Sequence, residues 1–230
     1  MANLFHVLNR GVDKRNIFLD KQDHFRFIHD LYELNNQDVV NTTFRVFGKM
    51  NDLRGRTINI EDKKPRKLLV DIHAFAMMPN HYHLLLSPKI EGGISKFMNK
   101  LNMGYVKYFN QKYKRQGTLF QGRSKKILIE DESHFIHLSY YIHLNPLDMH
   151  SPEWRDRELK DLKSAIKYLE NYRWSSHMDY AGIKNFPSVT NRDFLLRYFG
   201  GVKDYKNYIY CWLKSITQEQ LEDLKGIIFE

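Results

Sequence analysis

The chain has few of the residues that form cross-links or membrane anchors. Its 230 residues include one cysteine, Cys211, which excludes an internal disulfide and a cysteine-rich metal cluster. No segment approaches the ~20 apolar residues that cross a bilayer, and the N-terminal segment lacks the basic and then apolar layout of a signal peptide. We therefore expect a soluble, cytoplasmic protein without membrane contact, in which Cys211 is a buried thiol.

Acidic residues are fewer than basic ones. Lys and Arg number 36 against 27 Asp and Glu, which gives a formal net charge of +9. A positive charge of this size attracts polyanions, and nucleic acid is the first partner to consider. The alternative is a basic protein whose charge serves only solubility. The distribution of charge along the chain has to decide between the two.

The segment from Lys100 to Ile129 contains no acidic residue at all. Basic and aromatic side chains are interleaved there, a combination that contacts phosphates and stacks on the bases of single strands. Charged runs are more commonly solvated faces, but such faces usually mix both signs. About half of the aromatics belong to the core by helical periodicity. The predicted DNA contacts are two aromatics near a glycine-rich turn and a set of basic residues: Tyr113, Phe120, Lys107, Lys112, Lys114, Arg115, Arg123, Lys125 and Lys126, with Arg10 and Arg15 beside the first strand.

Hydrophobic periodicity predicts the order of strands and helices. Strands are expected at 4–10, 68–79 and 81–88, and helices at 20–34, 94–113, 131–145, 151–172, 192–199 and 202–215. The first helix is capped by Asp20, and its apolar face contains Phe25, Ile28, Leu31 and Tyr32. Residues 37–68 fit a hairpin or a long loop equally well, and we interpret 115–130 as a glycine-rich turn.

Two histidines stand one residue apart in "MPNHYHLLL", residues 78–86. Successive side chains of a strand alternate between its faces, so His81, His83 and Leu85 share one face. The two histidines lie roughly 6.6 Å apart along the strand, near enough to converge on one divalent cation. The alternative is a pair of ordinary half-buried histidines. A histidine-triad hydrolase is excluded, because position 85 is leucine.

The segment "SYYIHLNP" carries two adjacent tyrosines near the end of a predicted helix. Tyr141 and Asn145 are four residues apart and share a helix face, whereas Tyr140 has Leu144 in the equivalent place. If a tyrosine stands beside a metal-binding oxygen, it is therefore Tyr141. The alternative is that Tyr141 packs in the core and that Asn145 only ends the helix before Pro146.

Five blocks in order resemble the single-tyrosine HUH transposases, in particular the REP-associated tyrosine transposases of the IS200-like family. They are "HVLNRGVDKRNIF", "HAFAMMPNHYHLLLSP", "KYFNQKYKRQGTLFQGRSKKILI", "LSYYIHLNP" and "YRWSSHMDYAG". The resemblance implies an α+β fold, with a ferredoxin-like or RRM-like antiparallel sheet and helices packed on it. We expect a catalytic domain at 1–150, with an insertion at about 40–67, and a C-terminal helical extension at 151–230.

The resemblance also implies a chemistry. His81, His83 and Asn145 match the family's ligands for Mg²⁺ or Mn²⁺, and Tyr141 matches the nucleophile that forms a covalent 5′-phosphotyrosine. The expected partner is single-stranded or hairpin DNA, and the protein is a monomer or a homodimer. The absence of a GKS/T phosphate loop agrees with a reaction that needs no ATP.

Two alternatives stay open. A related HUH nickase, such as a replication initiator or relaxase, usually places its tyrosine differently and often carries two spaced tyrosines. Tyr140 and Tyr141 are adjacent and cannot share a face. A domesticated DNA-binding protein that no longer cuts would show a damaged site, whereas His81, His83 and Asn145 are intact here.

Overall fold

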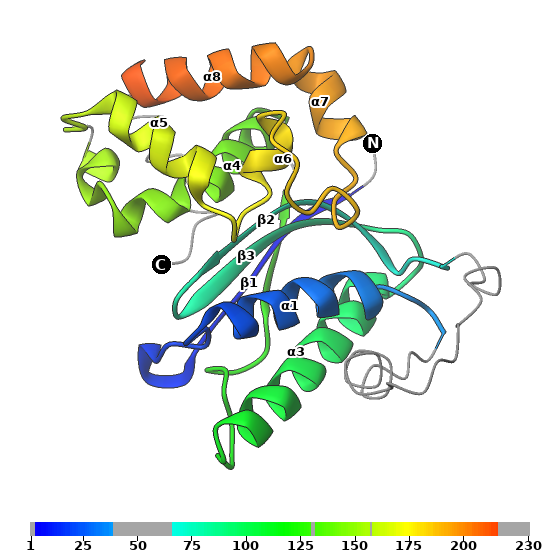
Figure 1. Cartoon of the computed structure of the whole chain (residues 1–230). Coiled ribbons are helices and arrows are strands. Elements are labelled where there is room, and N and C mark those ends of the chain that lie inside the picture. Colours follow the sequence, from blue (N-terminus) through cyan, green and yellow to red (C-terminus); the bar gives the residue numbers. More distant parts are fainter. Residues whose placement is uncertain (1–2, 39–65, 130–131, 157, 216–230) are drawn as a thin grey trace, which may run out of the picture.

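A four-stranded antiparallel sheet separates two layers of helices in the computed structural model (Figure 1). The structure describes residues 3–38, 66–129, 132–156 and 158–215. The expected insertion at about 40–67 therefore lies almost wholly outside the described residues. The strands are β1 (Leu4–Arg10), β2 (Val70–Met78), β3 (His81–Pro88) and β4 (Lys125–Ile129).

The strand order is β2-β3-β1-β4, and every neighbouring pair is antiparallel. Along the chain, a helix connects β1 to β2 and another connects β3 to β4. This is the ferredoxin-like arrangement, so the predicted α+β fold class is confirmed. The two central strands are β3 and β1, with Leu8 opposite His83 and Arg10 opposite His81.

One face of the sheet is covered by α1 (Lys21–Glu33) and α3 (Gly93–Lys112) (Figure 1). Helix α1 begins as predicted at Asp20, whose side chain accepts from the backbone N–H of Asp23 while Asp23 reciprocates. One detail of the expected apolar face is wrong, because Phe25 is 42% exposed and Phe27 is buried in its place. This core also contains Val7, Phe75, Tyr82, Leu84, Phe97 and Leu101.

The opposite face is covered by the later helices of the chain (Figure 1). These are α4 (Glu132–Leu144), α5 (Leu162–Asn171), α6 (His177–Tyr180), α7 (Asp193–Phe199) and α8 (Val202–Ser215). Short 3-10 turns lie at η1 (Val12–Lys14), η3 (Asn145–Met149) and η4 (Pro152–Asp156). The described part of the predicted extension shares one hydrophobic core with α4. No helix of the described chain is long and apolar enough to span a membrane.

Three expectations from the sequence are wrong. Residues 125–129, interpreted as part of a turn, form the edge strand β4 on β1. The helix expected at 151–172 is broken into η4 and α5, because Asp161 caps a new helix by accepting from the Ser164 N–H at 2.9 Å. Cys211 is exposed rather than buried.

A buried hydrogen-bond network ties α4 to α6 and α8. The Tyr205 hydroxyl lies 2.8 Å from Nδ1 of His143 and 2.8 Å from Nδ1 of His177, and Nε2 of His143 lies 2.7 Å from Oγ of Ser176. Burial lowers the pKa of His177 to about 4 and that of His143 well below its usual value. Both imidazoles are therefore neutral at pH 7, and the single hydroxyl of Tyr205 joins them.

Replacing Tyr205 with phenylalanine leaves two buried ring nitrogens without a partner. We expect Tyr205→Phe to lower the free energy of unfolding by about 1–3 kcal/mol in denaturant titrations. Tyr208→Phe is the matched control, because Tyr208 is on the same helix and is 51% exposed. Equal stability of the two variants would show that the network contributes nothing to the attachment of α4.

Candidate active site

His81 and His83 lie on the central strand β3 and point to the same face of the sheet. Their ring centroids are 5.1 Å apart, and both side chains are buried. Nδ1 of His81 lies 2.5 Å from Oδ1 of Asn80, which can only accept, so this Nδ1 carries the proton. Nε2 of each histidine is buried and has no hydrogen-bond partner among the described residues. Nε2 of His81 is thus a buried lone-pair position, and the buried, partnerless Nε2 of His83 lies on the same face of the strand.

A third histidine, which sequence reasoning missed, supports His83. His6 on β1 is fully buried, its Nε2 lies 2.8 Å from Nδ1 of His83, and the two rings stack at 5.0 Å. His6 opens one of the blocks that carry the family resemblance, which was the available signal. Its contact with His83 depends on the pairing of β1 with β3, and the strand pattern alone does not give that pairing.

Burial keeps these imidazoles neutral. It lowers the pKa of His81 to about 4 and that of His83 well below its usual value, and nearby Arg10 and Arg155 add to both shifts. Neutral imidazole with a free lone pair is the form that binds divalent metals. No cluster of three or more His, Cys, Asp or Glu side chains in the described part of the chain could hold a metal. A further protein ligand would therefore have to be of another type, such as an amide oxygen.

Tyr141 of α4 and Asn145 at the start of η3 lie on the same side as the histidines. The Tyr141 ring centroid is 6.1 Å from that of His83, and both Tyr141 and Asn145 are buried. Tyr140 instead stacks on Phe199 at 5.1 Å. The structure therefore brings Tyr141, and not its neighbour, to the histidine pair.

Arg155 of η4 joins the tyrosine to the asparagine and was also missed from the sequence. Its guanidinium donates to the Tyr141 hydroxyl oxygen at 2.9 Å, to Oδ1 of Asn145 at 2.9 Å and to Oδ2 of Asp148 at 2.6 Å. The same group lies over the Tyr141 ring, 5.2 Å from its centroid. Trp154 also packs against the phenol, at 6.1 Å between centroids. Together the two η4 side chains cover Tyr141, which is only 1% exposed.

Nine of the eleven predicted DNA-contacting residues fall into two groups, and Arg15, directly after η1, and Phe120 lie outside both. Around β4 lie Arg10, Arg123, Lys125 and Lys126, and Arg10 is directly opposite His81 in the sheet. On α3 and just after it lie Lys107, Lys112, Tyr113, Lys114 and Arg115. Lys107, Lys114, Arg123, Lys125 and Lys126 are exposed, whereas Arg10, Arg15, Lys112, Tyr113 and Arg115 are half-buried. Of these residues, only Arg10 is on a strand that pairs with the histidine strand β3.

Three of these residues do not fit the expectation. Phe120 is buried in the core and packs edge-on against Tyr82 at 6.0 Å, so it presents no face to a base. Lys112 forms ion pairs with Asp20 and Asp23 at 2.7 Å, and the Tyr113 hydroxyl donates to Asp23. The segment from Lys100 to Ile129 contains no acidic residue, but in the folded chain two carboxylates at the start of α1 lie against it.

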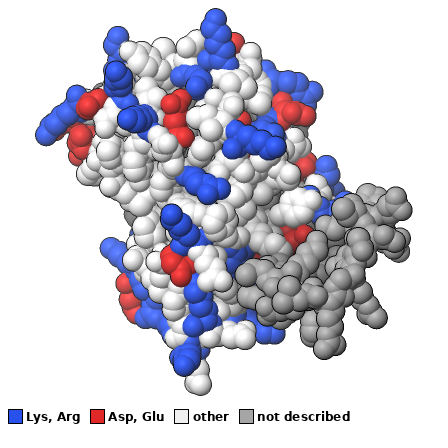
Figure 2. Space-filling model, in the orientation of Figure 1, with Lys and Arg blue, Asp and Glu red and all other residues white. Residues whose placement is uncertain are grey.

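The charge of the surface agrees with this correction. On the face in Figure 2, Lys and Arg are spread over both helical layers, and acidic side chains lie among them. The positive charge is not gathered into one patch on that face.

Comparison with known proteins places the chain in a family. A search of the curated proteins found no match. A solved structure described as "Structure of the REP associates tyrosine transposase bound to a REP hairpin" is similar at 14% identity, with 80% of this chain and 84% of that chain covered and a TM-score of 0.45. The profile of the family "Transposase IS200 like" matches residues 31–145, half of the chain, and includes both strand histidines, Tyr141 and Asn145. The chain belongs to the IS200-like transposase family.

Proposed function

We propose that this transposase cuts and rejoins single-stranded DNA, including hairpin DNA, with Tyr141 as its nucleophile. The observation that carries the proposal is the meeting of the Tyr141 phenol, the Asn145 amide and two buried, partnerless imidazole nitrogens on one face of the sheet. A purely structural histidine pair would have its Nε2 atoms hydrogen-bonded, because an unmade hydrogen bond costs free energy in a buried site.

The reaction exchanges one phosphodiester for another. The Tyr141 hydroxyl oxygen attacks phosphorus, the bond from phosphorus to the 3′ oxygen breaks, and the leaving 3′ oxygen takes up a proton. A 5′-phosphotyrosine and a free 3′-hydroxyl result. Attack by a 3′-hydroxyl on the phosphotyrosine then restores a phosphodiester and releases the phenol. No ATP is needed, because the number of phosphodiester bonds is conserved.

The residues present fit a divalent cation, Mg²⁺ or Mn²⁺. Nε2 of His81, Nε2 of His83 and Oδ1 of Asn145 would hold it, since an amide oxygen has a second lone pair besides the one that accepts from Arg155. When bound, such a cation would polarise the scissile phosphate and stabilise the leaving oxygen. His6 and Asn80 bind the Nδ1 atoms of His83 and His81, as the outer partners of metal-binding histidines do.

Arg155 prepares the nucleophile. A guanidinium has only donors and keeps its proton, so it cannot act as the base that deprotonates Tyr141. Its positive charge at 2.9 Å does favour the phenolate over the phenol. Arg155 therefore helps to activate the tyrosine at neutral pH, a role for which no residue could be named from the sequence.

Two further properties remain predictions. The division into a catalytic domain at 1–150 and an extension at 151–230 is retained, although Arg155 assigns part of the extension to the active site. The protein acts as a monomer or a homodimer. Among the alternatives, a nickase with two working tyrosines is disfavoured, because Tyr141 lies at His83 whereas Tyr140 stacks on Phe199 instead.

The first test concerns the nucleophile. The protein is incubated with Mg²⁺ or Mn²⁺ and hairpin oligonucleotides from the DNA that flanks its gene, and adducts that resist denaturation are separated on gels. We expect Tyr141→Phe to abolish the adduct and Tyr140→Phe to retain it, because only Tyr141 adjoins the histidines. The reverse result, or an adduct in both variants, contradicts the assignment. A wild-type protein that binds DNA without any adduct supports the non-cutting alternative.

The second test concerns the metal. Calorimetry with Mn²⁺ should give no binding for the double variant His81→Ala with His83→Ala. His6→Ala should weaken binding by about 10- to 100-fold, as the loss of an outer partner does. His150→Ala is the control, because that histidine lies at an exposed contact with Ser164. Undiminished Mn²⁺ affinity in the double variant would exclude the site.

The third test concerns Arg155. We expect Arg155→Gln to slow adduct formation by about 10- to 100-fold at pH 7, the loss of one hydrogen bond to a charged group. The deficit should shrink as the pH rises, because hydroxide in solution then takes over the removal of the phenol proton. Arg155→Lys should retain part of the rate, and Arg197→Gln, at an exposed arginine of α7, should retain all of it. A deficit that is equal at every pH would limit Arg155 to holding η4 in place.

A further inference from the structure

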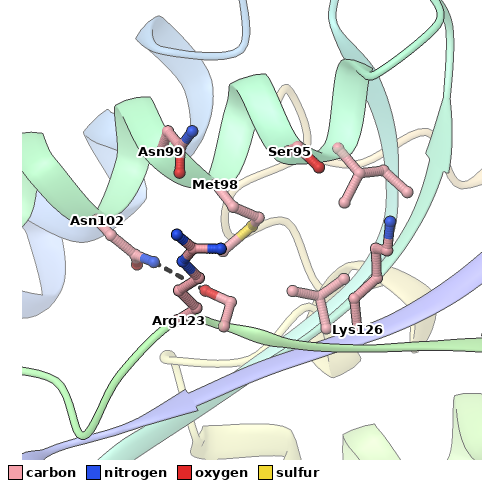
Figure 3. Close-up of a pocket in the computed structure, with 9 residues that line it drawn as sticks. Ser95, Met98, Asn99, Asn102, Arg123 and Lys126 are labelled. Atoms are coloured by element: carbon pink, nitrogen blue, oxygen red, sulfur yellow. Dashed lines mark hydrogen bonds between the residues drawn. The ribbon is translucent and has the colours of Figure 1, made fainter.

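A cavity of about 400 Å³ lies between α3 and the edge strand β4 (Figure 3). It is on the face of the sheet opposite the histidine pair, because Val7 in its lining is next to Leu8, which stands opposite His83. We call it the α3–β4 pocket. It is lined by Val7, Ile94, Ser95, Met98, Asn99, Asn102, Arg123, Ser124 and Lys126. The volume is in the range of pockets that hold one small ligand.

The lining combines apolar side chains, cations and the amides of α3. Val7, Ile94 and Met98 are buried and form an apolar floor. Arg123 and Lys126 approach from the β4 side, and no carboxylate lines the pocket. A flat apolar floor beside two cations suits an aromatic ring attached to an anionic group.

The amides on α3 are differently constrained. Asn102 donates to Ser124 at 2.8 Å and accepts from the Tyr82 hydroxyl at 2.7 Å, so its orientation is fixed (Figure 3). Asn99, three residues earlier on the same helix face, is exposed and makes no side-chain hydrogen bond with the described residues. An amide offers a donor and an acceptor together, the pair that reads the edge of a nucleobase.

A second cavity lies next to this pocket, on the histidine face of the sheet. It has a volume of about 140 Å³, shares Arg123 with the α3–β4 pocket and is also lined by Leu8, Arg10 and Lys125. Lys125, Leu8 and His83 stand opposite one another on three adjacent strands, so Lys125 is two strand spacings, roughly 10 Å, from His83. Neither cavity is lined by an acid. The phosphate backbone of a DNA strand can therefore pass from the active site, over the start of β4, to the sheet face that α1 and α3 cover.

We propose that the α3–β4 pocket binds one unpaired nucleotide of the DNA strand that is cut at Tyr141. The base rests on Met98 and its neighbours, Asn99 reads its edge, and Arg123 and Lys126 bind the phosphates that flank it. This inference rests on the proposed function for the identity of the strand, but not on the cutting chemistry. It makes Asn99 a specificity-determining residue remote from the nucleophile.

The test is a binding scan without cleavage. Hairpin oligonucleotides from the flanking DNA, with single-stranded tails on either side, are titrated by fluorescence anisotropy in EDTA, and the tightest is resynthesised with an abasic site at each tail position in turn. We expect one position to weaken binding by about tenfold or more, since one stacked base contributes that much. In Asn99→Ala the intact oligonucleotide should bind more weakly, and the abasic penalty at that one position should shrink.

The control variants separate the pocket from general charge. Arg123→Ala should weaken binding more than Lys107→Ala, since both residues are exposed but Lys107 lines neither cavity. Equal losses in these two variants, or an abasic profile that Asn99→Ala leaves unchanged, would overturn the proposal. So would a protein that binds none of the oligonucleotides.

Two further outcomes are decisive. If deoxynucleoside monophosphates displace the oligonucleotide tail, the pocket serves a free nucleotide, and the proposal as stated is wrong. If Tyr141→Phe retains the adduct but the abasic profile depends on Asn99, the nucleophile assignment fails and the nucleotide pocket stands. Binding and cleavage are read separately, so the two failures can be told apart.

Discussion

The pairing of β1 with β3 is the constraint on which the candidate site depends. It places Leu8 opposite His83 and Arg10 opposite His81, and it lets His6 stack on the ring of His83. A slip of one residue in either strand would move that strand's side chains to the other face. The histidines would then face α1 and α3, and the phenol on α4 would face the aliphatic residues Leu84 and Leu86.

The second layer positions the tyrosine through polar contacts as well as packing. On one side of α4, His143 is held by Ser176 and Tyr205, and on the other side Tyr141 and Asn145 are held by Arg155. Arg155 is in turn oriented by Asp148. Tyr141 thus depends on residues from three regions of the chain, at 148–155, at Ser176 and at Tyr205, and all three lie beyond the segment that the family profile matches. The segment beyond the family profile therefore shares hydrogen bonds and a hydrophobic core with α4.

The sequence predicts what depends on local pattern. The alternation around His81 and His83, the helical spacing of Tyr141 and Asn145, and the cap at Asp20 are all properties of a few consecutive residues, and the structure has them. It could not predict contacts that join distant segments. Lys112 was expected to face DNA, but α1 brings Asp20 and Asp23 to it from about ninety residues away. Strand β4 was missed for the same reason, because five residues with two lysines become a strand only where β1 offers an edge.

The burial of Tyr141 has a consequence for which DNA strands can reach its hydroxyl. The phenol is 1% exposed, and its cover is held by an ion pair whose two partners, Arg155 and Asp148, are each more than a quarter exposed. Such a pair is weak enough to open and is loosened by competing anions. A phosphate backbone that settles beside η4 is itself a competing anion for Arg155. If Tyr141 is the nucleophile that we propose, strands that do not bind beside η4 leave its hydroxyl buried, and the protein would bind many sequences but cut few of them.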